Sequence, residues 1–301
     1  MPTTAISETH RPGTLSLRHG RTLDWQARPL VMGVLNITPD SFSDGGLWLD
    51  PGAAVGHAQE MIAQGADILD LGAESTRPGG GIYGQGADSI SADEELRRLL
   101  PVLEALRHQV SVPISVDTRK GSVAKTVLSA GADLINDISA LDDPDLAAAV
   151  SAAGCLVVLM HSRGRLHSMQ QEIAFDDVVA EVAEELETMV ERAATHGIAR
   201  QQILVDPGIG FGKRVEHNLA ILRHLDAIGA LGLPLVVGAS RKSFIGEVTG
   251  AGADQRLSGS LATVGWAAHH GAAVVRVHDV AETHQFLAVW QAINSAPGIE
   301  Q

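Results

Sequence analysis

The chain has 301 residues, of which 45% are apolar and only 3% aromatic, and it contains 32 glycines. Its formal net charge of −14 argues against general nucleic-acid binding, which requires clustered Lys and Arg, but leaves room for a small anionic ligand held by a few cations. The one cysteine, Cys155, excludes an intrachain disulfide and a cysteine-rich zinc site.

The two ends of the chain are expected to flank one main domain. Residues 14–24, TLSLRHGRTLD, alternate apolar and polar side chains around His19-Gly20 and predict a β-hairpin. We expect residues 1–28 to form a tail and this hairpin, which closes the N-terminal face of a domain over residues 29–295, with residues 296–301 as a tail. The first residues lack the order of a signal peptide, and no apolar run approaches the ~18 residues of a membrane span. We therefore expect a soluble cytoplasmic protein that does not associate with membranes.

A weak internal repeat runs through the chain. Four segments read small residue, Gly, small residue, apolar run and polar group, namely QGADILDLG (64–72), AGADLINDIS (130–139), AAGCLVVLMH (152–161) and HGAAVVRVHD (270–279). The Gly is typical of a helix C-terminus, and the short apolar run is typical of a parallel strand buried on both faces. Extending the pattern predicts strands at about 30–36, 67–72, 114–117, 133–137, 155–160, 203–206, 235–239 and 273–277, each followed by helical sequence.

Eight such units predict an α/β protein of the (β/α)₈ barrel class. A doubly wound open sheet is the alternative, but it would carry a Gly-rich dinucleotide turn after the first strand, and the sequence has none. Among the helices, FDDVVAEVAEELETMVERAATHG has the clearest amphipathic pattern and ends at Gly197. The helix in ADEELRRLLPVLEALRH contains Pro101, which we expect to kink or reset it.

Every predicted strand ends in polar residues. They are Asn36, Asp70 with Glu74, Asp117, Asn136 with Asp137, His161, Asp206, Ser240 with Arg241 and Lys242, and Arg276 with His278. In a parallel barrel these ends lie on one face, and helix capping explains a single strand-end Asp better than a complete set. The face is therefore predicted to be a ligand site.

The residue types at this face indicate the ligand. Carboxylates, an amide and an ammonium group suit a flat heterocycle rich in N–H donors and ring nitrogens; these come from Asp117, Asn136, Asp206 and Lys242. Cations suited to a phosphate or diphosphate come from Arg77, Arg241, Arg276 and His278. The amide oxygen of Asn36 suits Mg²⁺, a hard cation that prefers oxygen ligands shared with phosphate.

The ordered motifs resemble those of a known family. GVLNITPDSFSDGG, DLGAESTRPG, SVDT, NDIS, LMH, DPGIGFGK, GASRKSF and RVHD occur in the order found in dihydropteroate synthases of folate biosynthesis, over about residues 30 to 290. The resemblance implies a homodimeric (β/α)₈ barrel whose substrates are 6-hydroxymethyl-7,8-dihydropterin pyrophosphate and p-aminobenzoate. It implies Mg²⁺ as cofactor, and 7,8-dihydropteroate and pyrophosphate as products.

The resemblance also implies roles for individual residues. Pterin-binding positions are Asp117, Asn136, Met160, Asp206, Phe211, Gly238 and Lys242. Diphosphate-binding positions are Asn36, Thr76, Arg77, Arg276 and His278, with Asn36 also on the metal. The p-aminobenzoate pocket takes Phe42, Thr76, Pro78, Phe211, Lys242 and Ser243, and the catalytic set is Asn36, Asp44, Asp117, Asp206 and Lys242. The polar loop at 37–46 is interpreted as a lid, and GGIYGQGADSIS after residue 79 lengthens the connection usual in the family.

Two other functions remain open at this point. A methyltransferase barrel that passes a methyl group from methyltetrahydrofolate to a corrinoid protein would share Asp117, Asn136 and Asp206, but would not require ESTRPG or SRKSF. A non-catalytic pterin-binding paralogue would be indicated by loss of residues such as Asn36, Arg77 or Lys242, and all three are present.

Overall fold

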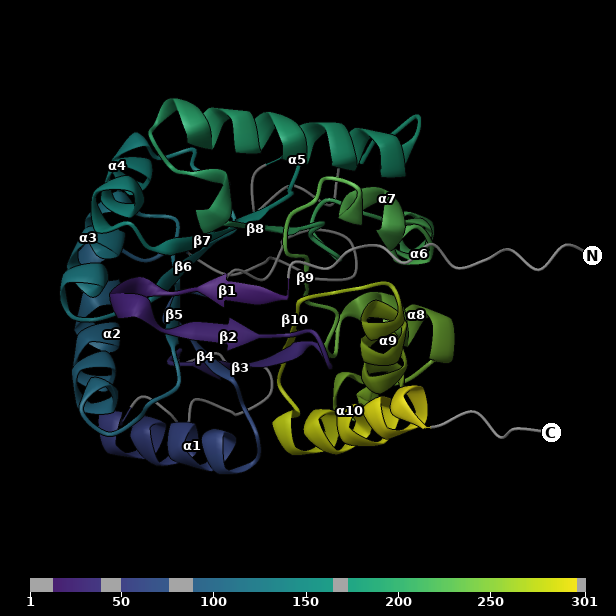
Figure 1. The fold of residues 1–301 in the computed structure, drawn as a ribbon, viewed down its shortest axis with the longest axis horizontal. Coiled ribbons are helices and arrows are strands. Elements are labelled where there is room, and N and C mark those ends of the chain that lie inside the picture. The colour runs from purple at the N-terminus through teal and green to yellow at the C-terminus, as the bar shows by residue number, and fades with distance from the viewer. Residues whose placement is uncertain (1–12, 39–49, 76–88, 165–172, 297–301) are drawn as a thin grey trace, which may run out of the picture.

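The computed structural model describes residues 13–38, 50–75, 89–164 and 173–296 (Figure 1). Eight parallel strands are hydrogen-bonded in the order β8-β7-β6-β5-β4-β3-β10-β9. Their bounds are β3 Leu30–Asn36, β4 Ile68–Gly72, β5 Ile114–Asp117, β6 Leu134–Asp137, β7 Leu156–Met160, β8 Ile203–Asp206, β9 Val236–Val237 and β10 Val274–Val277. A parallel bridge between Val205 and Leu235 brings the two outer strands together and nearly closes the sheet. The predicted (β/α)₈ barrel is confirmed.

Helices follow the strands and surround them on the outside (Figure 1). They are α1 Pro51–Ala63, α2 Ala92–Arg107, α3 Gly121–Ser129, α4 Pro144–Ala153, α5 Val178–Thr195, α6 Val215–Arg223, α7 Leu225–Gly229, α8 Ser243–Thr249, α9 Leu257–His269 and α10 Val280–Ser295. The expectation that Pro101 resets its helix is wrong, because α2 continues through it. Pro101 is exposed, so water can reach the carbonyl of Arg97 that a proline leaves without its helical donor.

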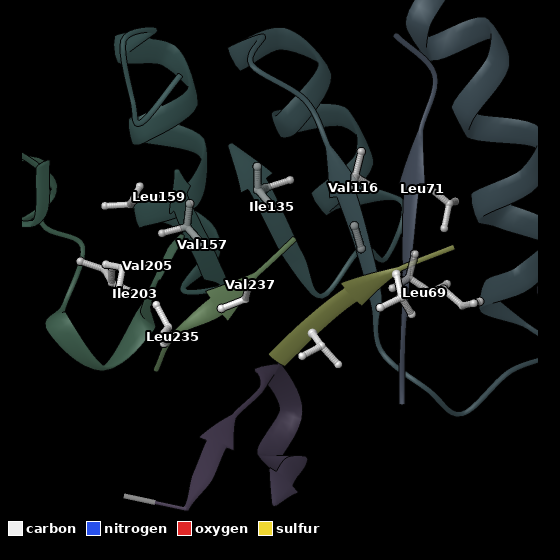
Figure 2. Packing of buried hydrophobic residues seen from close by; sticks show 14 of the residues in the cluster. Leu69, Leu71, Val116, Ile135, Val157, Leu159, Ile203, Val205, Leu235 and Val237 are labelled. Carbon is white, nitrogen blue, oxygen red and sulfur yellow. The ribbon is translucent and has the colours of Figure 1, made fainter. Parts of the chain in front are cut away.

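The larger part of the core lies between the sheet and the helices. It is formed by alternate strand residues, such as Leu69 and Leu71 of β4, packed against helix residues such as Leu99 and Leu103 of α2. Figure 2 shows this outward set along the barrel wall: Leu69, Leu71, Val116, Ile135, Val157, Leu159, Ile203, Val205, Leu235 and Val237. The residues between them point into the barrel.

A second apolar cluster fills the N-terminal part of the barrel interior. It consists of Leu30, Met32, Ile68, Leu134, Leu156, Val158, Leu204, Val236, Ala273 and Val274, covered by Leu15, Leu17 and Trp25. The covering residues belong to the antiparallel hairpin of β1 Thr14–Ser16 and β2 Thr22–Asp24, joined by the short 3₁₀ helix η1 Arg18–Gly20, and to Trp25 directly after it. The predicted hairpin therefore closes this end, and the opposite end of the barrel is left for polar side chains.

Within the described ranges, no helix is both long and apolar enough to span a membrane.

Helix termini follow the sequence signals closely. Asp50 caps α1 by accepting a hydrogen bond from the amide of Ala53, at 2.9 Å. Asp177 caps α5 in the same way, and Gly197 follows this helix with a positive φ of 79°.

Candidate active site

The polar residues of the site follow directly from strand alternation. Most inward-facing residues of this layer lie two positions after a residue of the inner apolar cluster, so they point into the same interior, one layer nearer the carboxyl ends of the strands; Asp117 lies two positions after the buried Ser115 instead. The pairs are Ile68 and Asp70, Leu134 and Asn136, Val158 and Met160, Leu204 and Asp206, Val236 and Gly238, and Val274 and Arg276.

Arg276 lies at the centre of this layer, between two carboxylates. Its Nε donates to Oδ2 of Asp70 at 2.6 Å, and its Nη2 donates to Oδ2 of Asp117 at 3.0 Å. Asn136 donates from Nδ2 to the same Asp70 oxygen at 3.1 Å. Asp70 is fully buried and Asp117 is 7% exposed, so strands β4, β5, β6 and β10 are tied together by a buried charged network.

Two oxygens of this network are buried and accept no hydrogen bond from the part of the chain that the structure describes: Oδ1 of Asp70 and Oδ1 of Asp117. Burial raises the pKa of Asp117 to about 7; the Arg276 guanidinium opposes that shift, and the nearby Asp70 carboxylate adds to it. Buried acceptors usually have donors, so these oxygens are suited to a ligand with N–H groups.

Asp206 and Lys242 form the other half of the site. Oδ1 of Asp206 accepts the amide of Gly208 at 2.7 Å, and burial raises the pKa of Asp206 against the opposing charge of Lys242. The ammonium of Lys242 donates to the carbonyl of Ile209 and lies 4.6 Å from the centre of the Phe211 ring. Burial lowers the pKa of Lys242 to about 8, and Asp206 opposes that shift. An aromatic face, an ammonium and a carboxylate thus lie beside the Arg276 network.

Other predicted residues surround this centre. Asn36 ends β3, with its amide oxygen 3.6 Å from the position that a Cβ on Gly72 would take. Met160 ends β7 and is 4% exposed, and Ser243 begins α8. Nδ1 of His278 lies 3.1 Å from Oγ of Ser240. The predicted residues Phe42, Asp44, Thr76, Arg77 and Pro78, most of the loop at 37–46 and most of the insertion after residue 79 lie outside the described residues.

Not every strand-end residue points into the interior. Asp137 caps its own loop by accepting the amides of Ser139 and Leu141, at 2.8 and 2.6 Å. His161 is fully buried against Glu185 and Lys213, outside the central network. Arg241, which the sequence analysis names as a candidate phosphate-binding cation, donates from Nε to Asp279 at 3.0 Å. It therefore forms an ion pair within the protein.

Sequence reasoning gave no role to two residues that the structure makes prominent. Asp70 was recognised only as a polar strand end, yet it accepts from both Arg276 and Asn136. The sequence signal for it is that Asp70 lies two residues after Ile68 on β4, so that the two side chains point to the same face. Lys213 appeared only as the end of a glycine-rich motif, although it is 3% exposed and bonded to the loop that follows Asp206.

The donor set at this face fits Mg²⁺ only if the substrate shares in binding it. Among the described residues, no group of three or more His, Cys, Asp or Glu side chains is arranged to hold a metal ion. Mg²⁺ is commonly held by one or two protein oxygens together with substrate phosphates. The amide oxygen of Asn36 supplies one such oxygen at the rim, which is compatible with that mode of binding.

Comparison with known proteins gives one consistent result. The model of the family described as pterin binding enzyme matches residues 32–278. Dihydropteroate synthase of Escherichia coli (strain K12) is 46% identical over 277 residues, covering 92% of this chain and 95% of that protein. The dihydropteroate synthase of Synechocystis sp. is 42% identical over 277 residues, covering 91% and 93%.

Solved structures agree with these relatives. Yersinia pestis dihydropteroate synthase, solved in a sulfonamide drug complex, superposes with a TM-score of 0.88 at 43% identity, covering 94% of this chain and all of that one (100%). The Xanthomonas albilineans enzyme with 4-aminobenzoic acid gives 0.85 at 44% identity, covering 95% and 99%. The same species' enzyme in complex with 7,8-dihydropteroate gives 0.80 at 39% identity, covering 95% and 100%. The chain therefore belongs to the family of pterin-binding enzymes, and within it to the dihydropteroate synthases.

Proposed function

We propose that this protein condenses 6-hydroxymethyl-7,8-dihydropterin pyrophosphate with p-aminobenzoate, giving 7,8-dihydropteroate and pyrophosphate. The observation that carries the proposal is the cluster of Asp117, Asn136, Asp206 and Lys242 around Arg276 at the carboxyl end of the barrel. Relatives solved with 4-aminobenzoic acid and with 7,8-dihydropteroate support both the second substrate and the product.

The pterin ring matches the chemistry of the buried groups. Its amino and ring N–H groups are donors, and the unpaired oxygens of Asp70 and Asp117 are acceptors within the same layer. The amide of Asn136 can donate and accept, so it suits an edge that presents both kinds of group. Phe211 offers an aromatic face to the flat ring, with the Lys242 ammonium nearby. We therefore propose that hydrogen bonds between these buried groups and the ring give the site its specificity for a pterin.

The diphosphate is assigned to Arg276, whose side chain is 23% exposed, together with His278 and Asn36. Arg276 has five N–H donors, and its bonds to Asp70 and Asp117 occupy Nε and one donor of Nη2. The remaining donors are available to a phosphate oxygen without breaking either ion pair. Mg²⁺ held by Asn36 and the diphosphate would neutralise charge on the leaving group.

The reaction then needs no covalent enzyme nucleophile. The bond between the pterin methylene carbon and the diphosphate oxygen breaks, and the electron pair leaves with pyrophosphate. In this proposal the carboxylates of Asp117 and Asp206 stabilise the positive charge that develops on the pterin. The neutral amine of p-aminobenzoate forms the new carbon–nitrogen bond, and its proton passes to solvent.

A substrate comparison tests this function against the methyltransferase alternative. The purified protein is incubated with labelled p-aminobenzoate and pterin pyrophosphate, or with methyltetrahydrofolate and a corrinoid acceptor. We expect labelled dihydropteroate in the first reaction and no methyl transfer in the second. Methyl transfer without condensation would replace the proposal, and pterin binding without either reaction would indicate a non-catalytic paralogue.

We also propose that the protein is a homodimer. Exposed large apolar residues of the described chain lie on α6, α8, α9 and α10: Leu219 at 43%, Val248 at 60%, Trp266 at 45%, Val289 at 58% and Ile293 at 70%. These helices are neighbours on one side of the barrel (Figure 1). Exposed apolar side chains on neighbouring helices are favourable to cover with a second copy of the chain.

Sedimentation measures this assembly directly. We expect the protein to sediment as a dimer, and the double change Val248→Glu and Val289→Glu to shift it toward the monomer while the helical circular dichroism is kept. A monomer for the unchanged protein across micromolar concentrations would contradict the assignment.

A further inference from the structure

Lys213 is a buried cation in the second half of the GIGFGK segment, and it does not line the central network. Its side chain is inserted beneath the loop that joins Asp206 to α6, and the residue is 3% exposed. Its ammonium lies 3.1 Å from the carbonyl of Gly208, 3.0 Å from the carbonyl of Phe211 and 2.9 Å from Nδ1 of His161. The carbonyl of His161 lies at 3.4 Å as well, so each of the three N–H donors of the ammonium group has an acceptor.

The tautomer of His161 follows from its two neighbours. Burial and the charge of Lys213 lower the pKa of His161 to about 3, so the ring is neutral. Nε2 faces a carboxylate oxygen of Glu185 at 2.9 Å, and it must carry the proton, because the carboxylate can only accept. Nδ1 is therefore free of a proton and accepts from Lys213. The result is a chain of hydrogen bonds from the loop to Glu185 on α5.

This series of hydrogen bonds continues from Glu185 to Arg163. This residue donates from Nε to Glu185 at 3.0 Å and from Nη2 to Glu181 at 2.6 Å, both carboxylates being on α5. Glu185 is thus held from two sides, by His161 and by Arg163. The position of Lys213 is consequently fixed by residues of the β7 loop and α5, well outside the pterin site.

The loop that Lys213 holds carries groups of the proposed pterin site. Its first residue, Gly208, donates to Asp206, and its aromatic residue, Phe211, lies 4.6 Å from the Lys242 ammonium. Lys213 takes the carbonyls of Gly208 and Phe211, and Lys242 takes the carbonyl of Ile209 between them. The loop is therefore held by two lysines, one beneath it and one beside the ligand site.

The glycines show how closely this loop packs on its support. Gly208 has a φ of 66°, and a Cβ there would come 1.8 Å from the carbonyl oxygen of His161. Gly212 has a φ of 60°, and a Cβ there would come 2.8 Å from the carbonyl oxygen of Arg163. Only glycine fits both positions, so the loop rests directly on the β7 loop.

From this geometry we infer that Lys213, held by His161 and Glu185, is a positioning residue for pterin binding: it fixes the Gly208–Phe211 loop so that Asp206 and Phe211 face the pterin. The inference rests on the proposed function and adds residues that do not themselves contact the ligand. Five charged or titratable groups face Lys213: Asp206, Lys242, His161, Glu185 and Arg163. Burial lowers the pKa of Lys213 to about 7, and the Asp206 and Glu185 carboxylates oppose that shift.

The test measures binding of two separate probes to the full chain. One is 6-hydroxymethylpterin, whose binding reports on the pterin site alone. The other is pyrophosphate with Mg²⁺, whose binding reports on the proposed diphosphate site at Arg276 and Asn36. We expect Lys213→Met to raise the Kd for the pterin by about tenfold or more, and to leave the Kd for Mg²⁺-pyrophosphate within about twofold. The control Lys125→Met, on the exposed face of α3, should change neither Kd.

A second pair of variants tests the link through His161. His161→Asn keeps an oxygen near the position of Nδ1 and should retain pterin affinity within about threefold. His161→Leu removes the acceptor and should weaken pterin binding as Lys213→Met does. This pair decides the question alone if Lys213→Met does not fold.

The outcomes separate the inference from the proposed function. If the unchanged protein binds no pterin, the proposed function fails. If it binds pterin but Lys213→Met binds equally well, or loses both probes equally, the positioning role is overturned. Equal pterin affinity of His161→Asn and His161→Leu would overturn the role of His161.

Discussion

Truncating Lys242 to alanine should remove most of the activity and leave the fold intact. Lys242 precedes α8 without capping it through its side chain, so no helix hydrogen bond is lost. Its ammonium donates to the carbonyl of Ile209 and lies 4.6 Å from the centre of the Phe211 ring, and we propose that it contacts both substrates. The change therefore acts on binding and chemistry more than on stability.

The magnitude follows from the contact that is lost. A hydrogen bond from a charged donor contributes about 1.5–3 kcal/mol. A loss of about 2–3 kcal/mol of transition-state stabilisation lowers kcat/KM by about 30- to 150-fold. Because burial lowers the pKa of Lys242 to about 8, the ammonium form is present at neutral pH and is lost as the pH rises through that value. The effect of the substitution should accordingly shrink above about pH 8.

The assay is the rate of labelled dihydropteroate formation at neutral pH and at about pH 9, with thermal unfolding as a check of the fold. Lys125→Ala, on the exposed side of α3, is the matched control and should retain full activity. Near-normal kcat/KM for folded Lys242→Ala at neutral pH would refute the role given to this residue.

Two further predictions use the same network. Arg276→Ala should weaken binding of the diphosphate-bearing substrate much more than binding of dihydropteroate, since only the former carries the charge; equal losses by calorimetry would contradict this. Burial raises the pKa of Asp117 from 3.8 to about 7, so its stabilising contribution is full below the unfolded pKa and is lost as the pH rises through about 7. The Tm of Asp117→Asn should therefore fall less between about pH 5 and pH 8 than that of the unchanged protein, and parallel curves would disprove the shift.

The fold could be predicted from the sequence because its signals are local and repeated. The strand predicted at 114–117 and that predicted at 203–206 have those bounds in the structure, since short apolar runs between turn residues leave little freedom in placing them. The shortest strand was less predictable: of the run 235–239 only Val236–Val237 form a strand, with Leu235 in a single bridge before it. Pro101 does not end α2, since a proline is tolerated where its helix faces solvent.

Parts of the site could not be predicted, because they depend on side-chain direction and on distant partners. Asp70 and Arg276 are 206 residues apart, and no local pattern shows that they form an ion pair. His161 directly follows β7, one position beyond Met160, and therefore points away from the interior. The place of Lys213 at the end of DPGIGFGK does not show which carbonyls surround it, and its role in the fold depends on them.

The central claim is tested most directly by stoichiometric coupling of the two substrates. The purified protein is incubated with pterin pyrophosphate and labelled p-aminobenzoate, with and without Mg²⁺, and dihydropteroate and pyrophosphate are both quantified. We expect equal amounts of the two products, formation that depends on Mg²⁺, and no product when either substrate is omitted. Pyrophosphate released without dihydropteroate, or no coupling by folded protein that binds both substrates, would contradict the central claim.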